Sequence, residues 1–173
     1  MLGNRVEPIR GLLMSTKEQT KAERELSVFD EFCTRSAVDV DRSSIQCQRP
    51  PKPDIACTVA GTATEFELVE ITDESLAANV ARSIKTGEVT GGAFSQHEPL
   101  IHAFASKQRK TYERAGSLQL LAYYDKQYPW SYADPTFIDE VVGEIARGMV
   151  SSGTWSHLWV YDTWKHQLLW QYP

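Results

Sequence analysis

The chain has 173 residues, of which 42 % are hydrophobic and 24 % charged, and this composition is typical of one ordinary globular domain. No apolar run approaches the roughly 18 residues that a membrane-spanning helix needs, so a transmembrane protein is not expected. The net charge of −5 argues against a general cationic coat for nucleic acid, although it leaves room for a local basic strip.

The N-terminal residues 1–17 predict a flexible lead-in, because they contain glycine and proline and have little periodicity. They also lack the long apolar stretch and the cleavage site of a signal peptide. The cysteines Cys33, Cys47 and Cys57 cannot all pair within one chain, and neither they nor the four histidines have the spacing of zinc ligands. We therefore expect reduced thiols, a cytoplasmic location and a single domain over residues 18–173.

The first predicted element is a helix over residues 20–35, in which Leu26 and Phe29 belong to an apolar set at helical spacing. Glu25 lies one turn before Phe29, so it borders the buried face of this helix. A short strand is predicted at residues 44–48, where the pattern is weaker.

A β-hairpin is predicted next. Residues 49–53 contain three prolines and cannot be helical, whereas residues 54–59 and 65–72 have the composition of two strands joined by a turn. Residues 73–85 predict a helix, because their apolar residues recur every four positions. The three glycines within residues 86–94 predict a mobile loop after it.

The second half of the chain begins with a capping box, which predicts a helix over residues 95–114. A near-continuous apolar run over residues 118–124 predicts a strand that is covered on both faces. Another helix is predicted from Asp134, where an N-cap is followed by proline, and residues 156–162 and 167–172 predict a closing hairpin. This order predicts an α/β fold with a mixed sheet flanked by helices.

Two carboxylates on the predicted hairpin are the sharpest chemical feature of the sequence. Asp54 opens one strand and Glu70 lies near the end of its antiparallel partner, so both can meet at one end of the sheet. Such a pair suits a hard divalent cation, which binds oxygen ligands and keeps several waters. Glu67 competes for this role, but Glu70 is preferred because it lies inside the apolar run of the strand. Alternatively, Asp54 caps a turn and Glu70 faces solvent.

A second feature is the predicted helix over residues 95–114. Gln108 and Tyr112 are four residues apart, on the same face as apolar residues, so the glutamine needs a hydrogen-bonding partner such as the sheet end or a substrate phosphate. An amide at the rim of the core is the alternative. The most basic stretch of the chain is also here: Lys107, Arg109, Lys110 and Arg114. It can contact phosphates, or it can form an ordinary solvated helix face.

Taken in order, these residues resemble the PD-(D/E)xK nuclease superfamily, which has the restriction-endonuclease-like fold. Pro53-Asp54 matches the start of its motif, and Glu70 matches the acid on the next strand, with Thr72 where the motif lysine stands. Glu25 matches the further acid that the preceding helix often supplies. Gln108 and Tyr112 match the Gln-x-x-x-Tyr element of RecB-type nucleases, and the resemblance covers roughly residues 20–125.

The resemblance implies a nuclease that hydrolyses DNA with Mg²⁺ or Mn²⁺. Asp54 and Glu70 would be the metal ligands, and Glu25 a further ligand or the base that orients water. Thr72 cannot supply a cation, so Lys107 is the expected substitute, with Lys85 as another candidate. The substrate-positioning residues would be Gln108, Tyr112 and Lys110.

Two alternatives stay open at this point. An inactive domain with the same fold could bind protein or nucleic acid, which the acidic pI of about 5.4 and Thr72 both favour. An unrelated α/β domain could carry these residues by chance. DNA is the expected partner, no membrane partner is expected, and a homodimer is left open.

Overall fold

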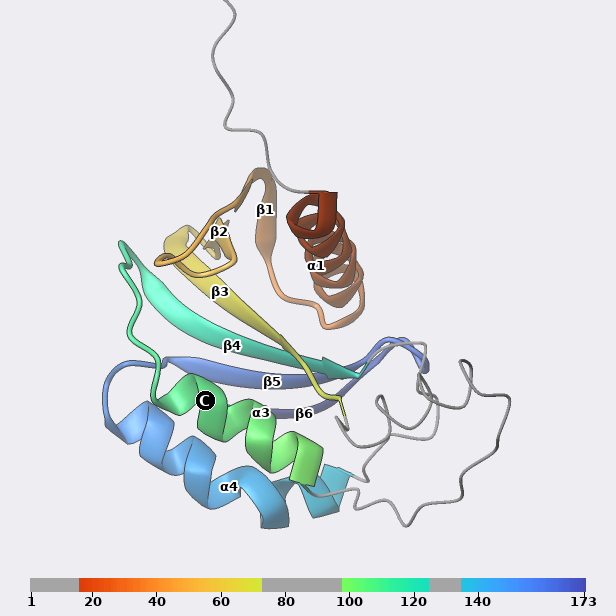
Figure 1. The fold of residues 1–173 in the computed structure, drawn as a ribbon, viewed down its shortest axis with the longest axis vertical. Helices are drawn as coiled ribbons and strands as arrows, with labels where there is room; N and C mark the ends of the chain where they lie inside the picture. The colour runs from red at the N-terminus through yellow and green to blue at the C-terminus, as the bar shows by residue number, and fades with distance from the viewer. Residues whose placement is uncertain (1–15, 73–97, 125–134) are drawn as a thin grey trace, which may run out of the picture.

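The computed structural model describes residues 16–72, 98–124 and 135–173. Within them a six-stranded mixed sheet has one helix, α1, on one face and two helices, α3 and α4, on the other (Figure 1). In chain order the elements are α1 Thr16–Arg35, β1 Val40–Cys47, β2 Ile55–Val59, β3 Thr62–Glu70, α3 Glu98–Gln108, β4 Ser117–Tyr124, α4 Pro135–Ser151, β5 His157–Asp162 and β6 Gln167–Tyr172. The expected α/β class, mixed sheet, C-terminal helix and closing hairpin are confirmed.

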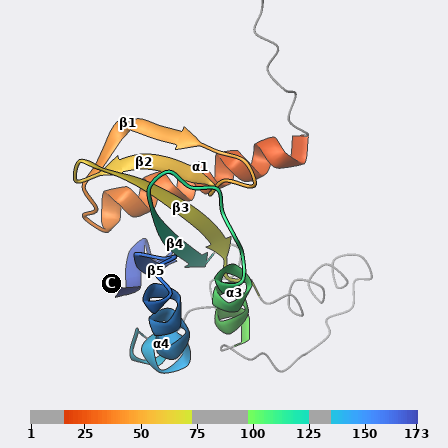
Figure 2. The same cartoon turned by 90° about the vertical axis from the view of Figure 1, so that its left-hand side faces the viewer.

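The strands lie in the sheet in the same order as in the chain. Strands β1, β2 and β3 form an antiparallel meander, β3, β4 and β5 are parallel neighbours, and β6 returns antiparallel to β5. Parallel neighbours need a long crossover connection, and α3 and α4 are parts of the two crossovers. Both helices therefore lie on the face opposite α1, as the turned view also shows (Figure 2).

The core on the α1 face is aromatic. Phe29 and Phe32 of α1 are fully buried, and the ring of Phe29 lies 4.9 Å from that of Phe66 on β3. Phe32 packs against Trp159 and Tyr161 of β5, at 5.4 and 5.8 Å between ring centroids. Burying each of these side chains contributes about 2–3 kcal/mol, so α1 is held on the sheet by its own apolar stripe.

The core on the other face joins α3 and α4 to strands β3–β6. Leu100 and Phe104 of α3 pack there with Ile138 and Val142 of α4 against the sheet. Strand β4 contributes to both cores, because alternate residues of a strand point to opposite faces. The expectation that residues 118–124 are covered on both faces is confirmed.

Several predicted boundaries are wrong. Helix α1 begins at Thr16, inside the expected lead-in, β1 is longer than the predicted strand over residues 44–48, and β3 ends at Glu70 rather than at residue 72. The helix expected to reach residue 114 ends at Gln108. Beyond Gln108 the chain leaves the helix and makes tertiary contacts instead, since the Glu113 N–H donates to the Pro51 carbonyl at 3.1 Å. At Gly116 a Cβ would lie only 2.4 Å from the carbonyl oxygen of Ala63, so the chain enters β4 where only glycine fits.

Other expectations fall outside the described residues. These are the lead-in up to residue 15, the helix over residues 73–85, the loop over residues 86–94 and the capping box at residues 95–97. In the part of the chain that is described, no helix is both long and apolar enough to cross a membrane.

Candidate active site

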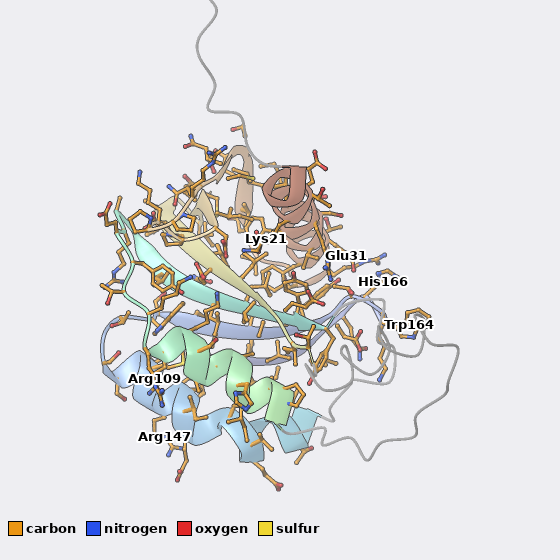
Figure 3. All side chains as sticks on the ribbon, in the orientation of Figure 1. Lys21, Glu31, Arg109, Arg147, Trp164 and His166 are labelled. Carbon is orange, nitrogen blue, oxygen red and sulfur yellow. The ribbon has the colours of Figure 1, made fainter. Side chains whose placement is uncertain are left out.

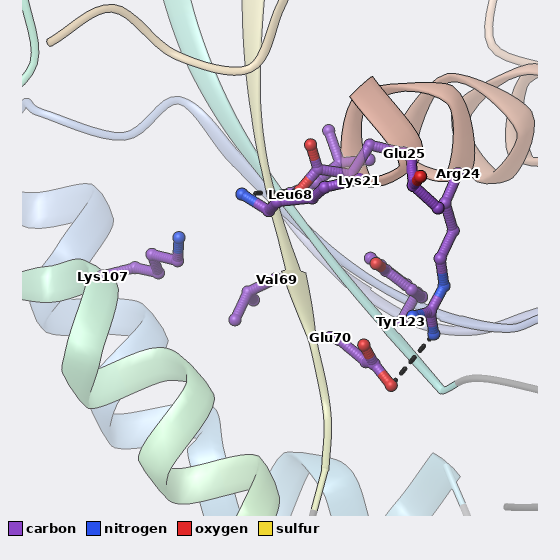
Figure 4. Close-up of a pocket in the computed structure, with 9 residues that line it drawn as sticks. Lys21, Arg24, Glu25, Leu68, Val69, Glu70, Lys107 and Tyr123 are labelled. Atoms are coloured by element: carbon purple, nitrogen blue, oxygen red, sulfur yellow. Dashed lines mark ion pairs between the residues drawn. The ribbon is translucent and has the colours of Figure 1, made fainter. Parts of the chain in front are cut away.

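The candidate site lies where β2 and β3 part. Strand β2 begins at Ile55, which is paired with Phe66, whereas β3 continues to Glu70 without β2 beside it. Asp54 directly precedes β2 and closes this gap, because its Oδ2 accepts the Leu68 N–H at 2.8 Å. The same register puts Asp54 opposite Glu67. Figure 4 shows α1 and α3 on either side of this edge of β3.

Glu67 carries the most buried carboxylate of this edge, with only 2 % of its surface exposed. Its Oε1 accepts hydrogen bonds from two ammonium groups, Lys107 Nζ at 2.5 Å and Lys110 Nζ at 3.1 Å. Lys107 lies in the last turn of α3, where a positive charge also suits the helix dipole. A buried charge is tolerated only when it is paired, and the two lysines explain how Glu67 is accommodated.

Helix α1 brings a third carboxylate to the site. Glu25 is 8 % exposed and pairs with Lys21 at 3.1 Å, one turn earlier on the helix. Arg24 pairs with Glu70 at 3.0 Å. An open cavity of about 390 Å³ lies between α1, β3 and α3, and its lining includes these four residues and Lys107 (Figure 4).

The carboxylates of the site repel one another. Burial, together with the charges of Glu67 and Glu25, raises the pKa of Asp54 to about 6, against the opposing effects of the Leu68 N–H and Lys21. Burial lowers the pKa of Lys21, but its hydrogen bond to Glu25 and the charge of that carboxylate more than compensate, so the net change is upward. A buried carboxylate close to other carboxylates binds a proton or a cation more readily than one in water.

The carboxylates of the site are the groups that could hold a divalent metal ion. Among residues 16–72, 98–124 and 135–173, no group of three or more His, Cys, Asp or Glu side chains is arranged to hold a metal ion. Magnesium needs only one or two protein carboxylates, because it keeps several waters. Asp54 and Glu67 meet this smaller requirement in number, and the burial of Asp54 near Glu67, which raises the pKa of Asp54, would also favour a bound cation. Both lysines bind Oε1 of Glu67.

Glu70, the acid preferred from the sequence, does not lie opposite Asp54. It lies three residues beyond Glu67, about 10 Å along the strand, on the face of the sheet that carries Leu68. The sequence feature that could have predicted this pairing is the length of the hairpin turn, which sets the register of the two strands. Ala60 and Gly61 form a two-residue turn with positive φ at both positions, which pairs the flanking residues 59 and 62 and therefore 54 and 67.

Three other residues predicted for the site lie in three different places in the structure: Thr72, Gln108 and Tyr112. Thr72 lies beyond the end of β3, five residues or about 16 Å from Glu67 along the chain. Gln108 is exposed, and its amide nitrogen lies beside Gly148 of α4. Tyr112 lies outside α3, where it packs on Trp155 at 5.7 Å. The expected stripe of Gln108 and Tyr112 on one helix face is therefore wrong, because α3 ends between them.

Burial and the charge of Glu67 raise the pKa of Tyr112, so this ring does lie near the acids, and Lys110 Nζ lies 5.1 Å above it. The predicted residues that lie near Asp54 and Glu67 are Glu25, Lys107, Lys110 and Tyr112. Glu70 lines the adjoining cavity with Glu25 and Lys107. Lys21 joins them through its ion pair with Glu25.

In comparisons with known proteins, no family model, no curated protein and no solved structure matches this chain. The chemistry of the site is therefore the basis for a functional proposal.

Proposed function

We propose that this chain is a metal-dependent phosphodiesterase of the PD-(D/E)xK type that cleaves DNA on a restriction-endonuclease-like fold. The observation that carries the proposal is the pair of carboxylates where β2 begins beside β3, Asp54 and the buried Glu67, with the Lys107 ammonium 2.5 Å from Glu67. The order of elements, one helix, three antiparallel strands, a crossover helix and a parallel strand, supports it.

In this proposal Asp54 and Glu67 would hold Mg²⁺ or Mn²⁺. The ion would lower the pKa of a bound water and neutralise charge on the phosphate. Counting from Glu67, the lysine of the acid-x-lysine motif falls on Val69 rather than Thr72. Lys107 would replace it from α3, stabilising negative charge on the reacting phosphate, and Glu25 would orient the attacking water.

A second candidate keeps the fold and drops the reaction. Two ammonium groups already bind one oxygen of Glu67, so the charge of this carboxylate is compensated without a metal. An inactive domain that binds protein or nucleic acid would use such a cluster only to hold β3 and α3 together.

A nuclease assay separates the two candidates. The purified chain would be incubated with single- and double-stranded DNA and Mg²⁺ or Mn²⁺, and Mn²⁺ binding would be measured by calorimetry. We expect Asp54→Asn and Glu67→Gln to reduce cleavage at least about 100-fold, and Lys107→Met to reduce it by a similar factor, because each removes charge that acts in the transition state. Glu140→Gln, an exposed change on α4, is the matched control.

Each result has a distinct meaning. The absence of both cleavage and Mn²⁺ binding would favour the inactive domain. Cleavage that survives Asp54→Asn and Glu67→Gln would mean that the active centre lies elsewhere. A loss in Glu70→Gln without a loss in Glu67→Gln would return the metal-ligand role to the acid preferred from the sequence.

A further inference from the structure

Two segments that are distant in the sequence meet beside the acid cluster. Residues 48–53 lie between β1 and Asp54, and residues 109–116 connect α3 to β4. The hydrogen bond from the Glu113 N–H to the Pro51 carbonyl joins them. Asp54 directly follows the first segment, and Lys110 of the second reaches Glu67. Both segments therefore adjoin the candidate site.

These segments carry cations that differ from those inside the site. Arg49, Lys52 and Arg114, here named the basic lip, are exposed. In the described part of the chain none of the three forms an ion pair with a carboxylate. The cations that line the site are paired instead, as Lys107 is with Glu67. The lip thus keeps its positive charge in a chain whose net charge is −5.

Hydrogen bonds fix the backbone turn at Arg49 and Lys52 and orient the side chain of Arg114. The Lys52 N–H donates to the Arg49 carbonyl at 2.9 Å, and such a turn holds the two Cα atoms within about 7 Å. The Arg114 guanidinium donates to the Thr154 carbonyl at 2.7 Å, which orients the group without neutralising it. Oriented guanidinium and ammonium groups are the usual ligands of phosphate oxygens.

We propose that the basic lip binds the phosphodiester backbone of a nucleic-acid strand next to the acid cluster, so that the chain takes a polymer rather than a single nucleotide. The inference rests on the proposed function in one respect: that function makes the phosphate beside Asp54 and Glu67 the one that reacts. Binding along the lip adds electrostatic affinity through released counterions, and it brings the adjoining phosphate to Asp54 and Glu67.

The test is a binding experiment in which cleavage plays no part. The full chain would be titrated with a short fluorescent single strand and with a duplex, in EDTA and separately with calcium ions, and binding followed by anisotropy. The lip variant is Arg49→Gln with Lys52→Gln, and Lys52→Glu is a second probe. The matched control is Arg35→Gln with Lys165→Gln. Figure 3 shows Arg109, which begins the second segment, on the opposite side from Trp164 and His166, the neighbours of Lys165.

We expect the lip variant to bind about tenfold more weakly. The slope of log Kd against log salt concentration should also be smaller by about 1 to 2 for this variant. Lys52→Glu replaces a positive charge of the lip by a negative one, so it should weaken binding at least as much as neutralising one lip cation would. The control pair should stay within about twofold of the unchanged chain. A free mononucleotide should not compete at the concentration of the oligonucleotide.

Three results would overturn the inference: equal weakening in the lip and control variants, competition by poly-glutamate as effective as that by the oligonucleotide, or binding of a mononucleotide as tight as that of the strand.

The outcome also separates the proposal for the basic lip from the proposed nuclease function. Lip-dependent binding without cleavage in any metal would support the lip and contradict the nuclease. Metal-dependent cleavage that lip substitutions leave unchanged, together with unchanged binding, would contradict the lip alone.

Discussion

Replacing Asp54 by asparagine should make the folded protein more stable at neutral and alkaline pH, even though it removes a residue of the proposed site. Burial, together with the charges of Glu67 and Glu25, raises the pKa of this carboxyl from 3.8 to about 6. The folded state therefore disfavours the ionised form that the unfolded chain adopts freely. Asparagine has nearly the same shape, and its side-chain oxygen can still accept the Leu68 N–H.

The magnitude follows from the pKa of Asp54. A difference of about two pKa units between folded and unfolded states corresponds to about 3 kcal/mol. Below pH 3.8 the carboxyl is protonated in both states and nothing is lost. As the pH rises through about 6 the folded state loses this stability, and above that value the loss is constant.

Urea unfolding of the two proteins at two pH values is the assay. Asp54→Asn should raise the free energy of unfolding by about 3 kcal/mol at about pH 8 and by well under 1 kcal/mol at about pH 4. Asp41→Asn is the control with the opposite sign, because hydrogen bonds from Ser43 lower the pKa of this exposed carboxyl. A gain that does not change with pH, or a loss of stability at about pH 8, would refute the reasoning.

Three further predictions concern buried contacts. Lys107→Met should lower the free energy of unfolding by about 1–3 kcal/mol in urea, because Glu67 keeps only its weaker lysine, and Glu67→Gln in the same chain should recover part of the loss. Glu65→Ala should cost about 2 kcal/mol in the same assay, since this buried carboxylate accepts two backbone N–H groups before β4, and Glu65→Gln should cost less. Gly116→Ala should lower the melting temperature by several degrees, because the new methyl group would overlap the Ala63 carbonyl; an unchanged temperature would contradict this.

The sequence contained enough information for most of the fold. Apolar residues at helical spacing located α1 and α4, and a run without alternation identified β4 as a strand covered on both faces. The composition of the last residues gave the closing hairpin of β5 and β6. These elements are set by local burial patterns, so their prediction needs no knowledge of distant contacts.

The end of α3 could not be read in the same way. Residues 109–114 continue a helical pattern, but Glu65 binds the N–H groups of Ala115 and Gly116, and Pro51 binds that of Glu113. The partners of this segment come from β3 and from the β1–β2 connection, about 50 residues or more earlier in the chain. Their combined hydrogen bonds outweigh a helix propensity that is worth only tenths of a kcal/mol per residue.

For the candidate site, the sequence by itself determined which residue types were present and that Asp54 and Glu25 border apolar elements. Only the tertiary structure decided that Glu67, rather than Glu70, lies opposite Asp54, because a shift of one residue in a strand moves a side chain to the other face of the sheet. It also brought Lys107 to Glu67 from a helix 40 residues later, a contact that no local pattern encodes. Charge pairing across that distance depends on where α3 packs, and packing is a property of the whole core.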